Sequence, residues 1–327
     1  MEENKHLKVE MGPETSNVRG VSQEVCLQNQ NTGFYDSVTQ NGTQVEVDMQ
    51  EKYSCLMRCF LLKSLDDCEV YSRLPFIHEL ENVEFYEIYE MINLLAMGVF
   101  YKQFNKILER RNEINANIDM DHAQFLLSRC VLLCREPTYP TFVLVVAFLS
   151  NVLILDVDDL ECFKVAYITE FCLSVLYRRI FWKIFRSRED YRRLQFFCIK
   201  FNKKFGLHSA FTKLPKASVY VNWKKLIQDC IEDPNIEFPL EESEIEMFRN
   251  ARRELDNMEC KPKMSLKIEN TYFSDSGLRK MHSLCAFCGT KCHNYLAYVS
   301  SFKSKELKNL NVMFQFGKAH RSNCLRI

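Results

Sequence analysis

The C-terminal part of the chain has a spacing of cysteines and histidines that is typical of a metal site. Cys285 and Cys288 are separated by two residues and followed by Gly289, and His320 and Cys324 follow near the end. A C-x-x-C pair can grip one ion in a tight turn, which a glycine permits. His320 and Cys324 stand at i, i+4, so they would share one face of a helix. These four side chains together predict a closed, tetrahedral zinc site of the structural type.

The sequence leaves open which residues are the distal ligands of this tail site. The loop between Cys288 and His320 is long for a minimal zinc finger. Cys292 or His293 could therefore replace the distal pair as ligands. The alternative is that these cysteines are thiols without a metal.

Two further cysteine pairs stand at helical spacing, Cys55 with Cys59 and Cys130 with Cys134. Each pair would lie on one face of a helix, and four thiolates from two helices would complete a second zinc site. Two spare ligands lie nearby in the sequence: His122 and Cys68. Because free cysteine commonly serves as a small core residue, a core position is the alternative for both pairs. Four more cysteines, among Phe, Leu and Ile residues, are predicted to be core: Cys162, Cys172, Cys198 and Cys230.

The middle of the chain carries a local excess of positive charge, although the net charge of the protein is zero. Between residues 178 and 225 there are 14 Lys or Arg residues and two acidic residues. Basic side chains neutralise phosphates and release counterions, which gives nucleic-acid binding without sequence specificity. The residues that we expect to contact nucleic acid are Arg178, Arg179, Arg186, Arg192, Arg193, Lys203 and Lys204.

Aromatic residues are interleaved with this basic stretch: Phe181, Trp182, Phe185, Tyr191, Phe196, Phe197, Phe201, Phe205 and Trp223. Aromatic rings could stack on bases, but at helical spacing we expect them to face the core. The alternative for the charges is a face that docks on acidic segments. Residues 66–90 contain eight acidic residues and residues 226–259 contain eleven. The basic stretch could therefore contact nucleic acid, the chain's own acidic segments or a second subunit.

The sequence contains no catalytic motif that we recognise. The P-loop, G-x-S-x-G, H-E-x-x-H and G-x-G-x-x-G patterns are absent. One acidic cluster could bind a divalent ion: Asp156, Asp158, Asp159 and Glu161. At the boundary between two predicted helices, helix capping is the better interpretation of this cluster. We therefore expect a protein that is not an enzyme.

The spacing of apolar residues predicts a mainly α fold, with a helical globular core, zinc-stabilised segments and a disordered polar N-terminal arm. Helices are expected at residues 53–65, 83–110, 120–135, 141–154, 159–185, 189–205, 222–232 and 241–258, and a short strand at 264–272. Pro137 and Pro140 should separate two of these helices. The longest apolar run, 142–155, is too short for a membrane span and predicts a buried helix.

Composition divides the chain into four parts. Residues 1–50 are the polar arm, 51–232 the helical core with its basic face, 233–263 an acidic linker and helix, and 264–327 the cysteine-rich zinc-binding tail. The N-terminus has no apolar stretch resembling a signal peptide, and fifteen cysteines without a secretory route indicate reduced thiols. We expect an intracellular protein that does not bind membranes.

The run from Leu126 to Cys134, Pro137, the apolar helix 142–155 and the acidic turn at 158–160 together resemble the core of the herpesvirus DNA-packaging proteins. These are cysteine-rich accessory factors required for genome cleavage and packaging. The early pair at Cys55 and the later Cys285 group are similar to cysteines of that family, and the resemblance covers residues 55–180 and 282–307. The early pairs depart from the family, because they are C-x3-C where it has C-x2-C.

The resemblance implies a zinc-stabilised helical protein that forms a ring-like homo-oligomer with a basic, DNA-binding channel. Other viral packaging or capsid proteins would be its partners, in the nucleus and cytoplasm of the infected cell. The first hypothesis is therefore a non-enzymatic, zinc-containing packaging factor that binds duplex DNA without sequence specificity. The second is a zinc-containing interaction or transcription-regulatory adaptor whose basic face contacts protein. The third is a metal-dependent hydrolase that uses the acidic cluster.

Overall fold

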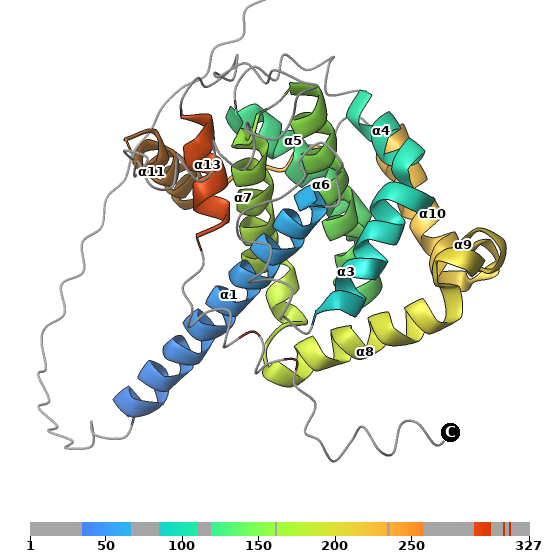
Figure 1. The fold of residues 1–327 in the computed structure, drawn as a ribbon. Helices are drawn as coiled ribbons and strands as arrows, with labels where there is room; N and C mark the ends of the chain where they lie inside the picture. Colours follow the sequence, from blue (N-terminus) through green and yellow to red (C-terminus); the bar gives the residue numbers. More distant parts are fainter. Residues whose placement is uncertain are drawn as a thin grey trace, which may run out of the picture. The chain divides into compact units, whose positions relative to one another are not determined.

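The computed structural model describes residues 35–66, 85–109, 119–160, 162–233, 236–257, 291–301, 310 and 314 (Figure 1). These residues are mostly helical and include no strand, which confirms the predicted mainly α class. The strand predicted at 264–272 lies outside them. The elements are α1 (Tyr35–Asp66), α3 (Tyr86–Asn93), the π-helix η1 (Leu94–Val99), α4 (Tyr101–Glu109), α5 (Asp119–Leu133), α6 (Tyr139–Leu160), α7 (Lys164–Arg179), the 3-10 helix η3 (Phe181–Lys183), α8 (Arg188–Phe205), α9 (Leu207–Lys213), the 3-10 helix η4 (Leu214–Lys216), α10 (Ser218–Glu232), α11 (Glu242–Asn257) and α13 (Cys292–Val299).

The chain divides into two units, Met1–Thr43 and Gln44–Ile327. Of the first unit the structure describes only the beginning of α1. The second unit contains the rest of α1 and the other described helices, whose buried side chains form one hydrophobic core.

Helix α1 begins earlier than the sequence pattern predicted. Residues 35–50, expected as part of the polar arm, are helical, and residues 1–34 lie outside the described part of the chain. Met49 and Tyr53 are both buried, so the apolar stripe of α1 extends one turn further back than expected. Lys52 forms an ion pair with Asp48 on the same turns. Among the described side chains of this polar segment, Met49 continues the apolar stripe of α1.

Helix α6 lies at the centre of the second unit. Its side chains from Phe142 to Leu149 are fully buried, and α3, η1, α4, α5, α7 and α10 pack around it (Figure 1). The stretch Tyr139–Val157 is long and apolar enough to cross a membrane, but 89% of its most apolar window is buried inside the structure. The predicted buried helix is therefore confirmed. A helix that is apolar on every side needs neighbours on every side.

The start of α6 is set by threonines and prolines. The backbone N–H of Thr138 donates to Oγ1 of Thr141 at 3.0 Å, and the N–H of Thr141 donates to Oγ1 of Thr138 at 3.3 Å. These bonds satisfy N–H groups that have no partner within the helix. Pro140 stands in the first turn, where its missing N–H costs nothing. The predicted break around residues 136–140 is confirmed between the end of α5 at Leu133 and the start of α6.

The single helix predicted over residues 83–110 is divided by a π-helical segment. Its three parts are α3, η1 and α4, and the N–H of Phe100 donates to the carbonyl of Leu95 at 3.0 Å, five residues back. The buried Asn151 of α6 donates to the carbonyl of Ala96 at 3.4 Å. A side-chain donor from a neighbouring helix thus serves a carbonyl of the widened turn. Spacing within one segment could not reveal this partner.

Replacing Phe142 by Ala should lower the free energy of unfolding by about 3–5 kcal/mol, because it opens a cavity among packed rings. Phe142 is fully buried and its ring centroid lies 5.2 Å from that of Phe181 and 4.8 Å from that of Phe185. The matched control is Phe211→Ala on α9, where the ring is 66% exposed and the change should stay within about 0.5 kcal/mol. Urea unfolding of both variants measures the difference. Equal losses would contradict this description of the core.

Candidate nucleic-acid interface

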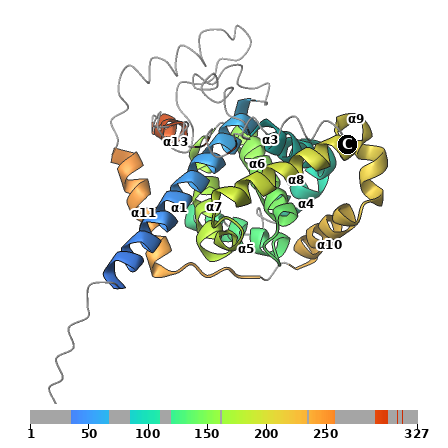
Figure 2. The ribbon, with the colours of Figure 1, turned by 90° about the horizontal axis from the view of Figure 1, so that it is seen from below.

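Helix α8 separates its apolar and basic residues onto opposite faces. Tyr191, Leu194, Cys198, Phe201 and Phe205 are buried at three- and four-residue spacing and attach the helix to the core. The exposed residues recur at the same spacing on the other side, which we call the outer face: Arg193, Phe196, Lys200, Lys203 and Lys204. In Figure 1 the helix runs along the lower edge of the second unit, and Figure 2 views the unit from that side.

The two acidic residues of α8 are confined to its first turn. The backbone N–H of Ser187 donates to the Asp190 carboxylate at 2.9 Å, which caps the helix start. Glu189 occupies the same turn, near the positive end of the helix dipole. From residue 191 to the end of α8 every charged residue is basic. Capping therefore accounts for the acidic residues and leaves the outer face positively charged.

The first basic residues of α8 retain weak ion pairs within the helix. An Arg192 guanidinium nitrogen lies 3.6 Å from the Glu189 carboxylate, and one of Arg193 lies 3.8 Å from that of Asp190. The Arg193 side chain is 64% exposed. Exposed pairs of this kind contribute little free energy, so a phosphate can replace the carboxylate at low cost.

The aromatic residues of the basic stretch fall into two groups. Six are buried, as predicted: Phe181, Phe185, Tyr191, Phe201, Phe205 and Trp223. Phe197 is partly buried, whereas Trp182 and Phe196 are 40% and 46% exposed. The guanidinium carbon of Arg186 lies 4.9 Å from the Trp182 ring centroid, and Lys200 Nζ lies 4.4 Å from that of Phe196. Trp182 and Phe196 are thus each accompanied by a cation, whereas none of the described cations lies over Phe211, a third exposed ring of this stretch.

The basic residues at the end of α7 are turned toward the chain's own acidic helix. Arg179 binds Glu244 of α11 through Nε at 2.8 Å and through Nη2, and its guanidinium carbon lies 4.5 Å from the Phe238 ring centroid. Arg178 donates to the Met247 sulfur at 3.2 Å. These two arginines therefore dock on the acidic segment of the chain, which was the alternative interpretation of the basic stretch.

The predicted thiol pairs that the structure describes lie in the hydrophobic core. Cys55 and Cys59 are buried on α1, and Cys130 and Cys134 are buried in and just after α5. Burial raises the pKa of Cys59 and of Cys130, and it raises the pKa of Cys134 to about 11. Neutral thiols are therefore favoured at these positions, whereas zinc requires thiolates.

Metal binding by these pairs stays a prediction. Within the described ranges no group of three or more Cys, His, Asp or Glu side chains is arranged to hold a metal ion. The tail ligands Cys285, Cys288, His320 and Cys324 lie outside the described residues. Cys292, the alternative tail ligand, is buried at the start of α13 and accepts a hydrogen bond from the Phe163 N–H at 3.2 Å.

The acidic cluster at the end of α6 is described only in part. Asp156 is 2% exposed, and its carboxylate lies 3.8 Å from His122 Nε2 of α5. The side chains of the other three members, at positions 158, 159 and 161, lie outside the described part of the chain. The observed contact of Asp156 is one between two core helices.

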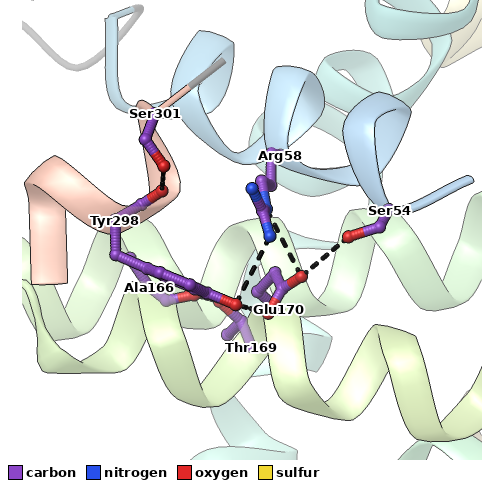
Figure 3. Close-up of polar contacts among 7 residues, drawn as sticks. All are labelled: Ser54, Arg58, Ala166, Thr169, Glu170, Tyr298 and Ser301. Carbon is purple, nitrogen blue, oxygen red and sulfur yellow. Dashed lines mark hydrogen bonds and ion pairs between the residues drawn. The ribbon is translucent and has the colours of Figure 1, made fainter. Parts of the chain in front are cut away.

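A buried polar network joins α1, α7 and α13, and spacing did not reveal it. The Glu170 carboxylate is 5% exposed and accepts hydrogen bonds from Ser54 Oγ at 2.9 Å and Arg58 Nε at 3.5 Å (Figure 3). Tyr298 donates to the other carboxylate oxygen at 3.4 Å. Thr169 beside it bonds only to backbone, the carbonyls of Val165 and Ala166. A lone glutamate among apolar residues of α7 was the available signal, since a buried charge requires a partner.

Electrostatics keep Arg58 charged within this network. Burial alone would lower the pKa of Arg58, but the Glu170 carboxylate raises it above its ordinary value. Burial and the same carboxylate raise the pKa of Tyr298 to about 12, so its hydroxyl stays a donor at neutral pH. The guanidinium carbon of Arg58 also lies 4.8 Å from the Tyr298 ring centroid. The network therefore fixes the positions of α1, α7 and α13 relative to one another.

The fold and the outer face of α8 define an α-helical protein with a basic, aromatic-bearing surface helix. No protein-family model, curated protein or solved structure that was compared with the chain matches it.

Replacing Glu170 by Gln should lower the free energy of unfolding by about 3 kcal/mol, because it leaves the Arg58 guanidinium buried without its counter-charge. The double variant Arg58→Met with Glu170→Leu should recover much of this loss, since two apolar residues bury no charge. The control Arg253→Met on α11 removes an exposed arginine and should change little. Urea unfolding provides the measurement. A double variant as unstable as the sum of its single variants would contradict the pairing.

Proposed function

We propose that the chain is a non-enzymatic accessory factor that binds nucleic acid without sequence specificity through the outer face of α8. The observation that carries the proposal is the concentration of exposed cations on that face, where Arg193, Lys200, Lys203 and Lys204 lie on the same side of the helix as the exposed Phe196. Phosphate contacts of this kind supply affinity and carry no sequence information.

The geometry of α8 favours an extended polyanion over a single small anion. Arg193 and Lys204 are separated by eleven residues, which is about 16 Å along a helix. The described basic residues of the face are long and largely exposed, so each can adjust to a phosphate. Arg186, beyond the N-terminus of α8, is also exposed and extends the positive surface. A chain of phosphates can engage several of these cations at once.

The zinc-containing part of the proposal rests on the tail residues and the family resemblance. Cys285 and Cys288 with His320 and Cys324 would hold one structural zinc ion, with Cys55, Cys59, Cys130 and Cys134 as candidates for a second. The resemblance to herpesvirus DNA-packaging proteins would make the nucleic acid a viral genome. Oligomerisation, packaging or capsid partners and a location in the host nucleus and cytoplasm belong to the same proposal.

The second candidate function is a zinc-containing interaction or transcription-regulatory adaptor whose basic face contacts protein. One observation favours it. Arg179 is bound by Glu244 and lies 3.6 Å from the Glu241 carboxylate, so part of the basic stretch already contacts an acidic segment. An acidic helix of another protein could engage the outer face of α8 in the same manner.

Duplex binding by the full chain should weaken steeply with salt, and the variant Arg192→Ala/Arg193→Ala/Lys203→Ala/Lys204→Ala should bind more weakly with a shallower slope. Each lost phosphate contact should reduce the slope of log K against log salt by about 0.9. Fluorescence anisotropy across a salt series measures both quantities.

A matched variant separates this effect from a change in net charge. Lys102, Lys106, Arg249 and Arg253 are exposed basic residues on α4 and α11. Replacing these four by Ala removes the same charge and should leave affinity and slope nearly unchanged. Binding that is flat with salt, or absent at low salt, would exclude the nucleic-acid proposal and favour the adaptor.

Elemental analysis of the purified chain should find about one zinc ion per molecule, and Cys285→Ser/Cys288→Ser should lose it, because a C-x-x-C pair supplies half of a tetrahedral site. Cys55→Ala/Cys59→Ala should retain the ion, since these thiols are buried in the core. Two or more zinc ions in the unmodified chain would assign metal to the early pairs as well. A protein without zinc would overturn the metal proposal.

A further inference from the structure

Two aromatic residues of the basic stretch, Trp182 and Phe196, are both exposed to water and paired with a cation. Phe181 and Phe185, on either side of Trp182, are fully buried, as are the core-facing rings of α8 around Phe196. Exposing a large ring to water forgoes the free energy that burial would provide. Phosphate binding needs cations only, so neither ring is explained by a polyanion-binding face.

Each of the two rings is paired with an exposed cation four residues further along the chain. Arg186 lies over Trp182 and Lys200 lies over Phe196, at 4.9 and 4.4 Å from the ring centroids. Both cations are on long exposed side chains that can move to a neighbouring phosphate. A nucleotide whose base is not paired presents a flat π-face together with a phosphate, and this combination matches a ring with an adjacent cation.

We infer that Phe196 and Trp182 are stacking platforms for unpaired bases, so that the ligand class of the α8 face is single-stranded nucleic acid. This inference rests on the proposed function, because the cations of the same face must bind the phosphates. In a duplex the base faces are stacked on one another and only phosphates, sugars and base edges are accessible, so the two rings would contribute nothing. Every base has a π-face, and the binding is therefore tolerant of sequence.

The chain provides its own spectroscopic reporter of stacking. It has two tryptophans, Trp182 and Trp223. Trp223 is fully buried, and its Nε1 donates to the Pro140 carbonyl at 3.1 Å. A base that stacks on Trp182 should quench its emission and leave that of Trp223 unchanged. Inorganic polyphosphate supplies the charge without a base and should bind without this quenching.

The test compares oligo(dT) of about 16 nucleotides, a duplex of the same length and inorganic polyphosphate as ligands of the full chain at low salt. We expect oligo(dT) alone to quench the emission, and Phe196→Ala to weaken oligo(dT) binding on the order of tenfold while duplex and polyphosphate binding stay unchanged. Phe196→Trp should restore the affinity. The control is Phe211→Ala: this ring is also exposed, but none of the cations that the structure describes lies over it.

The outcomes separate the inference from the function on which it rests. Equal binding of duplex and oligo(dT), with no quenching and no effect of Phe196→Ala, would overturn the stacking inference and leave non-specific polyanion binding in place. The absence of binding to all three ligands would overturn both, and the exposed rings would then be better explained as contacts for a protein partner.

Discussion

The burial of α6 is the constraint on which the rest of the second unit depends. Its residues from Phe142 to Leu153 are almost completely buried against one another and against the helices around them. Such a helix is stable in water only when neighbours cover it on all sides, which α3, α4, α5, α7 and α10 do. Of these helices, α3 packs against α8, and α7 packs against η3 and α13. The position of the basic helix therefore follows from the need to cover an apolar one.

Several charged groups inside this arrangement form ion pairs between helices. Glu170 with Arg58 joins α7 to α1, and Lys164 of α7 and Arg252 of α11 each lie 2.7 Å from the Asp119 carboxylate of α5. A buried charge without such a partner would cost several kcal/mol, so these pairs favour one alignment of the helices over others. Arg179 with Glu244 belongs to the same set. The cations on the outer face of α8 are exposed to water instead.

The outer face combines two properties that have separate physical origins. Its positive charge persists because the acidic residues of α8 cap the first turn, at the positive end of the helix dipole. Its exposed ring, Phe196, and Trp182 in the preceding 3-10 helix remain in water although burial would stabilise them, and the stacking inference is built on this exposure. The zinc proposed for the tail would stabilise the chain, whereas the proposed ligand surface consists of α8 and the turn before it.

The sequence by itself determined the helical class, the break at residues 136–140, the buried apolar helix and, to within two residues, the bounds of α5, α8 and α11, because periodicity and proline act locally. It also located the excess of basic residues. Only the tertiary structure decided which of those residues are available: Arg179 is bound to α11, while Lys200 and Lys203 remain exposed. It likewise decided that Phe196 faces water and Phe201 the core, and that Glu170 meets Arg58 across more than a hundred residues. Local pattern cannot specify such pairings, because they depend on which helices the burial of α6 brings together.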